Sequence, residues 1–245
     1  MVEVPFMKQV VPSSWMRQDR VPMMGGAFDA RILKKKAPFM GVVIALLIVQ
    51  LLLTFFVMER LYKNTKFQDF LEKNKVYMVL AFLLPFVIIL ILAFVPMPMY
   101  MKLLLFSLFS IAFGILLSMV RRYATPELIR AAVVATLGIF VSMFVVGIVL
   151  SGLGYDLFWL GMILFVVLLI LVIAGVIMLF TNPDQKVVRA RAIIVIILFA
   201  IYVLYDTNQI IMREYYGDYV TAGIDYYLDF VNIFTALVQV LSGSN

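Results

Sequence analysis

The sequence has no cysteine and no histidine in its 245 residues, and only 14% of them are charged. Without cysteine the chain forms no disulfide and has no thiolate nucleophile. The lack of both residue types also excludes most zinc sites. Because the imidazole switch is missing, any proton-linked behaviour near neutral pH must use carboxylates with shifted pKa values.

Hydrophobic residues make up 65% of the chain. Soluble domains are nearer to ~45–50% apolar and ~25% charged. The apolar residues also come in blocks of about twenty, which is the length of helix that crosses ~30 Å of hydrocarbon. We therefore predict an all-α integral membrane protein that crosses the bilayer several times.

Seven hydrophobic segments follow one another along the chain. They cover about 39–58, 76–95, 102–120, 127–150, 157–180, 190–212 and 219–242, and a charged loop at 59–75 joins the first two. Pro126 and Glu127 open the fourth segment, because proline fits the first turn of a helix and a carboxylate suits its positive end. The prediction is a polar N-terminal tail at 1–38 and a seven-helix transmembrane domain at 39–245.

The formal net charge of +6 does not indicate nucleic acid in a membrane protein, since loop cations commonly set topology or contact anionic lipid. A basic run, Arg31, Lys34, Lys35 and Lys36, lies just before the first segment. It is either a lipid-headgroup contact or an orientation signal. The membrane is either a bacterial-type plasma membrane or a eukaryotic endomembrane such as the ER or Golgi.

Acidic residues appear inside the last two hydrophobic segments. Asp206 lies in the sixth, and Asp225 and Asp229 lie in the seventh. A carboxylate deep in a bilayer costs at least ~2.5–3.5 kcal/mol on insertion scales, so it faces protein or water and indicates function. Asp225 and Asp229 are spaced i,i+4, and Asn232 continues their helix face, while Asn208 follows Asp206.

Two carboxylates that meet in a low dielectric titrate as a unit, because they cannot both ionise cheaply. We expect Asp206 and Asp229 to share a proton that bridges the two helices, and to separate or bind a cation when it is lost. Ca²⁺ needs roughly 6–8 oxygens, so the two carboxylates suit a transient site on a conduction path. Asp225, Asn232 and Asn208 are further candidates on that path. The alternative is that each Asp is hydrogen-bonded for helix packing.

Two C-terminal motifs resemble the transmembrane Bax inhibitor motif (TMBIM) family. Residues 198–209 read LFAIYVLYDTNQ, and residues 227–234 read YLDFVNIF. The resemblance implies a seven-helix fold in which six helices surround a central last helix. It also implies a pH-sensitive Ca²⁺ leak and, in eukaryotic members, dampened cell death. Asp206 and Asp229 match the family's aspartate pair, which is its proposed pH sensor.

The chain departs from the family at one position. In some members an Arg after the second span latches one of the aspartates, but residues 95–102 here read VPMPMYMK. The nearest cation is Lys102, which lacks the guanidinium fork. Lys102 is therefore a possible but imperfect latch.

We predict a pH-sensitive Ca²⁺ leak channel that is not an enzyme and has no resident cofactor. The expected partners are Ca²⁺, the lipid bilayer and other membrane proteins, but not nucleic acid. One alternative is a non-conducting membrane protein that inhibits apoptosis by restraining death factors through its helices. Another is an intramembrane aspartyl protease, which the Tyr205-Asp206 pair fits. Asp229, however, follows Tyr-Tyr-Leu in place of the Gly-x-Gly of those enzymes.

Overall fold

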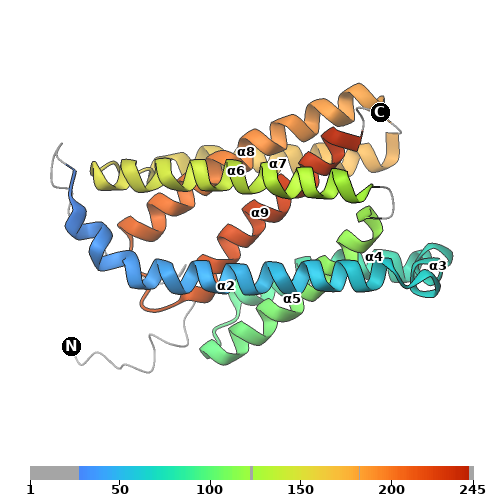
Figure 1. Ribbon diagram of the computed structural model, residues 1–245, viewed down its shortest axis with the longest axis horizontal. Coiled ribbons are helices and arrows are strands. Elements are labelled where there is room, and N and C mark those ends of the chain that lie inside the picture. Colours follow the sequence, from blue (N-terminus) through green and yellow to red (C-terminus); the bar gives the residue numbers. More distant parts are fainter. Residues whose placement is uncertain (1–27, 122–123, 182, 243–245) are drawn as a thin grey trace. The chain divides into compact units, whose positions relative to one another are not determined.

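The computed structural model describes residues 28–121, 124–181 and 183–242, and every regular element in these ranges is an α-helix (Figure 1). The helices are α2 (Ala30–Tyr62), α3 (Thr65–Lys73), α4 (Lys75–Phe94), α5 (Met99–Arg121), α6 (Pro126–Gly152), α7 (Phe158–Thr181), α8 (Gln185–Met212) and α9 (Tyr219–Ser242). The all-α prediction is confirmed for this part of the chain.

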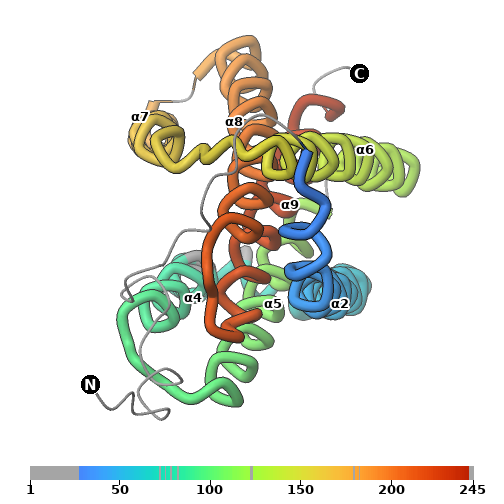
Figure 2. Tube along the Cα trace, turned by 90° about the vertical axis from the view of Figure 1, so that its left-hand side faces the viewer, coloured from blue at the N-terminus to red at the C-terminus, as the bar shows by residue number. Residues whose placement is uncertain are grey.

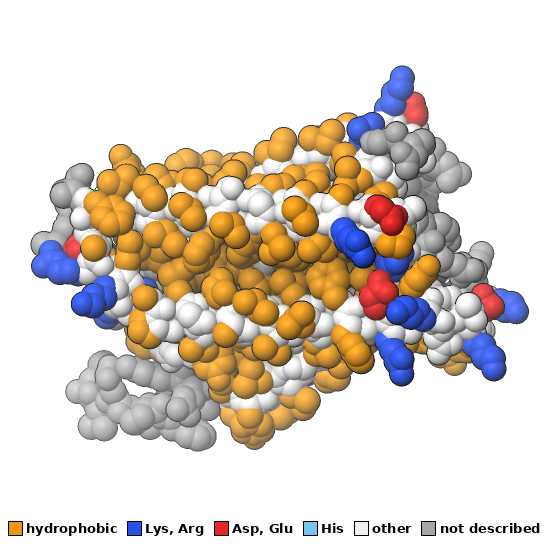
Figure 3. All heavy atoms as spheres, viewed as in Figure 1, with side chains coloured by type: hydrophobic (Ala, Val, Ile, Leu, Met, Phe, Trp, Pro, Cys, Tyr) orange, Lys and Arg blue, Asp and Glu red, His pale blue; other side chains and the backbone are white. Residues whose placement is uncertain are grey.

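Six of the described helices, α2 and α5 to α9, are long and apolar enough to cross a membrane. The second predicted span corresponds to α4, whose apolar segment Val79–Phe94 is shorter. Hydrophobic side chains cover the middle of the helices on the face in Figure 3, and charged side chains lie toward the helix ends. The multi-pass membrane assignment is confirmed. The count of seven spans and the central place of the last helix stay predictions.

The chain divides into two compact units. The helices α2 and α9, which can be followed in Figure 2, each contribute residues to both. The described part of the first unit is 39–121, Ala124 and 215–227. The described part of the second is 28–38, 125–181, 183–214 and 228–242.

The first unit has an aromatic core where α5 meets the first half of α9. The ring of Tyr227 lies 5.5 Å from that of Phe106 in an edge-to-face arrangement, and 5.6 Å from that of Phe109. All three residues are almost inaccessible to solvent. Such aromatic pairs add specific geometry to the burial of large apolar surfaces.

The second unit packs α8 against α6 and α7. Gly147 of α6 allows a close approach, because a Cβ atom there would lie 2.6 Å from Thr207 Cβ and 2.8 Å from the Leu204 carbonyl oxygen. Small residues at such crossings are the usual means of bringing membrane helices together. Leu164 and Leu171 of α7 form an apolar cluster with Leu198 of α8.

The start of α6 follows the sequence expectation. Thr125 caps the helix, accepting a hydrogen bond from the Leu128 amide at 3.2 Å, and Pro126 and Glu127 occupy its first turn. The Thr125 hydroxyl gives a partner to an amide that would otherwise lack one. Pro126 has no backbone N–H, so it leaves one fewer amide without a partner.

Two segments differ from the expectation. α2 begins at Ala30, so residues 30–38, which we assigned to the polar tail, are helical, whereas residues 1–27 of that tail lie outside the described residues. The charged loop predicted at 59–75 contains α3, which Asn64 caps. Gln68 anchors α3 by donating to the Leu61 carbonyl and to Ser118 Oγ of α5.

Candidate functional site

The second unit contains both members of the predicted aspartate pair. Asp206 is half-buried on α8, and Asp229 is buried on α9 with 2% of its surface exposed. Tyr202 is half-buried in the same unit and lies one helical turn before Asp206 on α8. Tyr202 therefore joins the candidate site, while a proton shared by the two aspartates stays a prediction.

Sequence reasoning missed Tyr202, although its position held a signal. Tyr202 precedes Asp206 by four residues, so one helical turn places both on the same face of α8. Its ring also contacts that of Tyr205, at 6.4 Å and nearly perpendicular. Tyr205 in turn fills the space left by Gly161 of α7, where a Cβ atom would lie 2.3 Å from the tyrosine oxygen.

Asn208 is fully buried and connects α8 to the segment between α6 and α7. Its amide nitrogen donates to Ser151 Oγ at 2.9 Å and to the Tyr155 carbonyl at 2.7 Å. Its oxygen accepts from the Leu157 amide at 2.9 Å and from Gln209 Nε2 at 3.0 Å. These bonds hold a loop against the helix, and the predicted role of Asn208 on an ion path stays a prediction.

The remaining path candidates lie on α9. Asn232, in the second unit, is half-buried and donates to the Leu228 carbonyl one turn earlier at 2.7 Å. Asp225 is half-buried and belongs to the first unit. The structure therefore places Asp225 in a different unit from Asp206 and Asp229.

In the first unit, Lys102 forms a buried ion pair with Asp218. The Lys102 nitrogen lies 2.5 Å from Asp218 Oδ2, and the two side chains are only 4% and 9% exposed. Asp218 also caps α9 by accepting from the Thr221 amide at 3.1 Å and from its hydroxyl at 2.8 Å. A latch from Lys102 to Asp206 or Asp229 stays a prediction, and Asp218 is the partner that the structure gives to this cation.

Glu214, between α8 and α9, forms ion pairs with two lysines of the basic run. Its carboxylate lies 3.0 Å from the Lys35 nitrogen and 3.4 Å from the Lys36 nitrogen. Lys36 is buried and also donates to the Arg213 carbonyl, while Arg31 pairs with Asp29. Burial raises the pKa of Glu214, but the hydrogen bond from Lys35 and the charge of Lys36 outweigh burial and hold this pKa below its usual value.

The described residues contain no group of three or more Asp, Glu, His or Cys side chains that would hold a metal ion. Asp206 and Asp229 supply at most four carboxylate oxygens, short of the ~6–8 that a tight Ca²⁺ site needs. Transient binding of a passing Ca²⁺ ion, completed by water, stays a prediction.

Comparison with known proteins gives one family. The model of the family described as "Inhibitor of apoptosis-promoting Bax1" matches residues 37–245. BI1-like protein of Arabidopsis thaliana is 26% identical over 83% of this chain and 79% of its own length. Bax inhibitor 1 of Schizosaccharomyces pombe is 26% identical over 83% of this chain and 75% of its own length.

Protein LIFEGUARD 4 of Arabidopsis thaliana is 28% identical over 137 residues. That match spans 56% of this chain, and the chain spans only 56% of the length of this relative.

Proposed function

This chain belongs to the Bax inhibitor family, and we propose that it is a pH-sensitive Ca²⁺ leak channel gated by Asp206 and Asp229. The observation that carries the proposal is that both aspartates belong to one unit, with Asp229 buried and Asp206 half-buried. A buried carboxylate in a membrane helix is costly, and such residues commonly mark ion or proton pathways.

The gating mechanism follows from the chemistry of two neighbouring carboxyl groups. When they share one proton, a hydrogen bond between them joins α8 and α9 and closes the path. When that proton leaves, two negative charges in a low dielectric repel each other, and the helices part or a cation enters. Ca²⁺ flux should therefore rise as the pH rises through the upper pKa of the pair.

The aromatic and amide groups near the pair support this arrangement. The Tyr202 hydroxyl can donate a hydrogen bond to a carboxylate, both when the pair shares a proton and when it has lost it. The bonds from Asn208 to Ser151 and Tyr155 fix the end of α8 that carries Asp206. Because α8 is held in place, α9 would be the helix that moves when the pair loses its proton.

The test is Ca²⁺ flux through the purified full-length protein in liposomes, measured from pH 5 to 8. Asp206→Asn and Asp229→Asn each replace an ionisable group by a neutral one of the same shape. Each variant should lose most of the pH response. If both keep the wild-type pH profile, the sensor assignment is wrong.

Asp184→Asn is a matched control on the same helix as Asp206. Asp184 is exposed and caps α8 by accepting from the Lys186 amide at 3.2 Å. Asn caps helices about as well as Asp, so this variant removes one charge while keeping the cap. It should retain the wild-type pH profile.

A second candidate function rests on the names of the relatives. Bax inhibitor 1 of Schizosaccharomyces pombe is named for inhibition of Bax, so a non-conducting protein that restrains death factors through its helices is the alternative. The same liposomes separate the two functions. A purified protein that passes no Ca²⁺ at any pH favours the alternative, and conduction favours the channel.

A further inference from the structure

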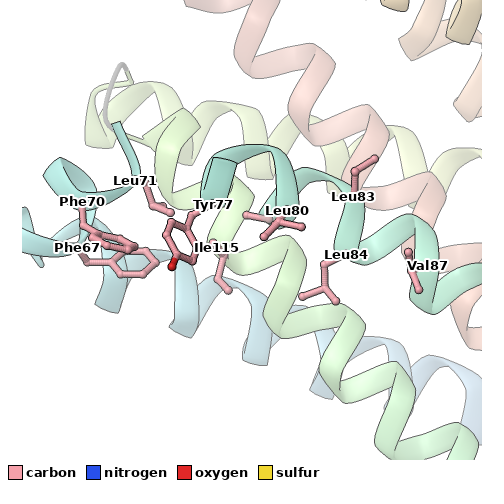
Figure 4. Close-up of a pocket in the computed structure, with 10 residues that line it drawn as sticks. Phe67, Phe70, Leu71, Tyr77, Leu80, Leu83, Leu84, Val87 and Ile115 are labelled. Atoms are coloured by element: carbon pink, nitrogen blue, oxygen red, sulfur yellow. The ribbon is translucent and has the colours of Figure 1, made fainter. Parts of the chain in front are cut away.

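An apolar pocket of about 490 Å³ lies in the first unit, where α3 meets α4 and α5 (Figure 4). Its walls include Phe67 and Phe70 of α3, Leu80, Leu84 and Val87 of α4, and Ile115 of α5. The volume is within the ~300–1,000 Å³ typical of small-molecule sites. Nothing in the Ca²⁺ proposal uses this pocket.

The pocket wall consists almost entirely of hydrocarbon, and part of it is open. Phe70 is 45% exposed, Leu80 55% and Leu84 44%. The phenyl ring of Phe70 lies 5.0 Å from the ring of Tyr77, and both residues line the pocket. In a membrane protein, exposed apolar surface of this kind is covered by lipid tails.

α3, which forms one end of the pocket, is amphipathic, as expected for a helix at the membrane surface. Phe67, Phe70 and Leu71 of α3 face the pocket in Figure 4. Lys66 and Lys73 are exposed, and their spacing of four and three residues from Phe70 places them beside it on the helix surface.

The charge around this helix is positive. Residues 59–75 contain five Lys or Arg and three Asp or Glu. One of the acidic residues, Glu59, is paired with Arg121 of α5 at 2.9 Å, outside this segment. Lys63, Lys66 and Lys73 are all exposed. Cations near an anionic membrane surface contribute about 1 kcal/mol each to lipid attraction.

We propose that the α3–α4–α5 pocket binds one acyl chain of an anionic phospholipid whose phosphate contacts Lys66 and Lys73. The apolar wall recognises the chain, and the bordering cations recognise the headgroup. Bound in this way, the lipid fills the space between α3 and α4 and secures α3 against the membrane.

The experiment uses the full-length protein in nanodiscs that contain phosphatidylglycerol with a photoactivatable diazirine in one acyl chain. After illumination, mass spectrometry locates the labelled peptides. We expect label at the pocket residues of α3 and α4 that saturates at one lipid per protein. Unlabelled phosphatidylglycerol should compete more strongly than unlabelled phosphatidylcholine.

Two kinds of variant separate the chain from the headgroup. Ala81→Trp places an indole in the pocket and should reduce the label there by about tenfold. Leu90→Trp is the control on the same helix, because Leu90 is 55% exposed and does not line the pocket. Lys66→Gln should weaken the preference for phosphatidylglycerol by about fivefold, and Lys186→Gln, an exposed cation of the second unit, should leave it unchanged.

Label in the wild-type pocket that never saturates, or that phosphatidylcholine displaces equally well, would overturn the proposal in favour of ordinary surrounding lipid. The proposal would also be overturned if the pocket peptides stay unlabelled while a second copy of the protein, or another protein, co-purifies with it. Because the wild-type labelling pattern decides both outcomes, the test does not depend on the folding of any variant.

Discussion

α7 and α9 have the same length, 24 residues, and both are long and apolar enough to cross a membrane. In the most apolar 18-residue stretch of each helix, 11% is buried inside the protein in α7 and 56% in α9. α7 contains no charged residue, whereas α9 contains Asp225 and Asp229. A helix that lipid surrounds is apolar on every side, and polar residues accumulate on a helix that protein surrounds, because protein can satisfy them.

The largest expected effect concerns the buried ion pair at the start of α9. Asp218→Asn keeps a capping side chain but leaves the Lys102 charge uncompensated, so we expect a loss of about 3–5 kcal/mol in the free energy of unfolding. Lys102→Met should have a similar cost. The measurement is denaturant unfolding in detergent micelles.

The double variant, Lys102→Met with Asp218→Asn, tests the reason for this cost. Removing both charges leaves no unpaired ion, so it should recover most of the lost stability. Additive losses would mean that each side chain acts alone and that the ion pair is unimportant.

Truncation of one isoleucine in each helix compares α7 with α9 directly. Ile233 of α9 is fully buried, and Ile173 of α7 is 52% exposed. Ile233→Ala should destabilise the protein by about 2–5 kcal/mol by leaving a cavity, while Ile173→Ala should change stability by less than about 0.5 kcal/mol. Thermal unfolding of both variants under one condition is the check. Equal losses would contradict the division into a buried and a lipid-facing helix.

The same contrast exists within α6 at two glycines. A methyl group at Gly147 would meet Thr207 and the Leu204 carbonyl of α8, but at Gly138 it would meet nothing within 4 Å. Gly147→Ala should therefore cost about 1–3 kcal/mol through overpacking. Gly138→Ala should be neutral or slightly stabilising, since alanine favours the helix. Two variants of equal stability would show that α6 and α8 do not pack this closely.

The smallest effect is expected at Glu214, where the ion pairs are partly exposed. Its pKa is held below the ordinary value of 4.5, so its contribution is present above that pH and is lost as the pH falls through the lower native pKa. Glu214→Gln should cost about 0.2–1 kcal/mol at pH 7. The difference from wild type should vanish in acid, and thermal unfolding across pH 3–7 measures it. A pH-independent difference would assign the effect to packing.

Most of the membrane helices were predictable, because long apolar runs have few other possible structures. Two helical segments were missed for a common reason. Residues 30–38 and 65–73 are rich in charge, and charge at a membrane surface is compatible with both loop and helix. Only their contacts decide, such as the hydrogen bonds of Gln68 to Leu61 and Ser118.

The candidate site was predictable only in part. The cost of burying a carboxylate singled out Asp206 and Asp229, and helix spacing could also have found Tyr202. The Lys102–Asp218 pair joins residues 116 positions apart, and no local pattern links them. Likewise, the amide of Asn208 is typical of a polar path, yet its partners lie more than fifty residues earlier, at the end of α6 (Ser151) and in the loop that follows (Tyr155).

Asp206 and Asp229 are proposed to titrate as one unit, and a double-variant cycle on the size of the pH response of Ca²⁺ flux between pH 5 and 8 tests this most directly. Wild type, Asp206→Asn, Asp229→Asn and the double variant are compared in the same liposomes. If the aspartates share one proton, either single change removes the shared titration, and the double variant behaves like the singles. Partial losses of the pH response that add up in the double variant would contradict the account.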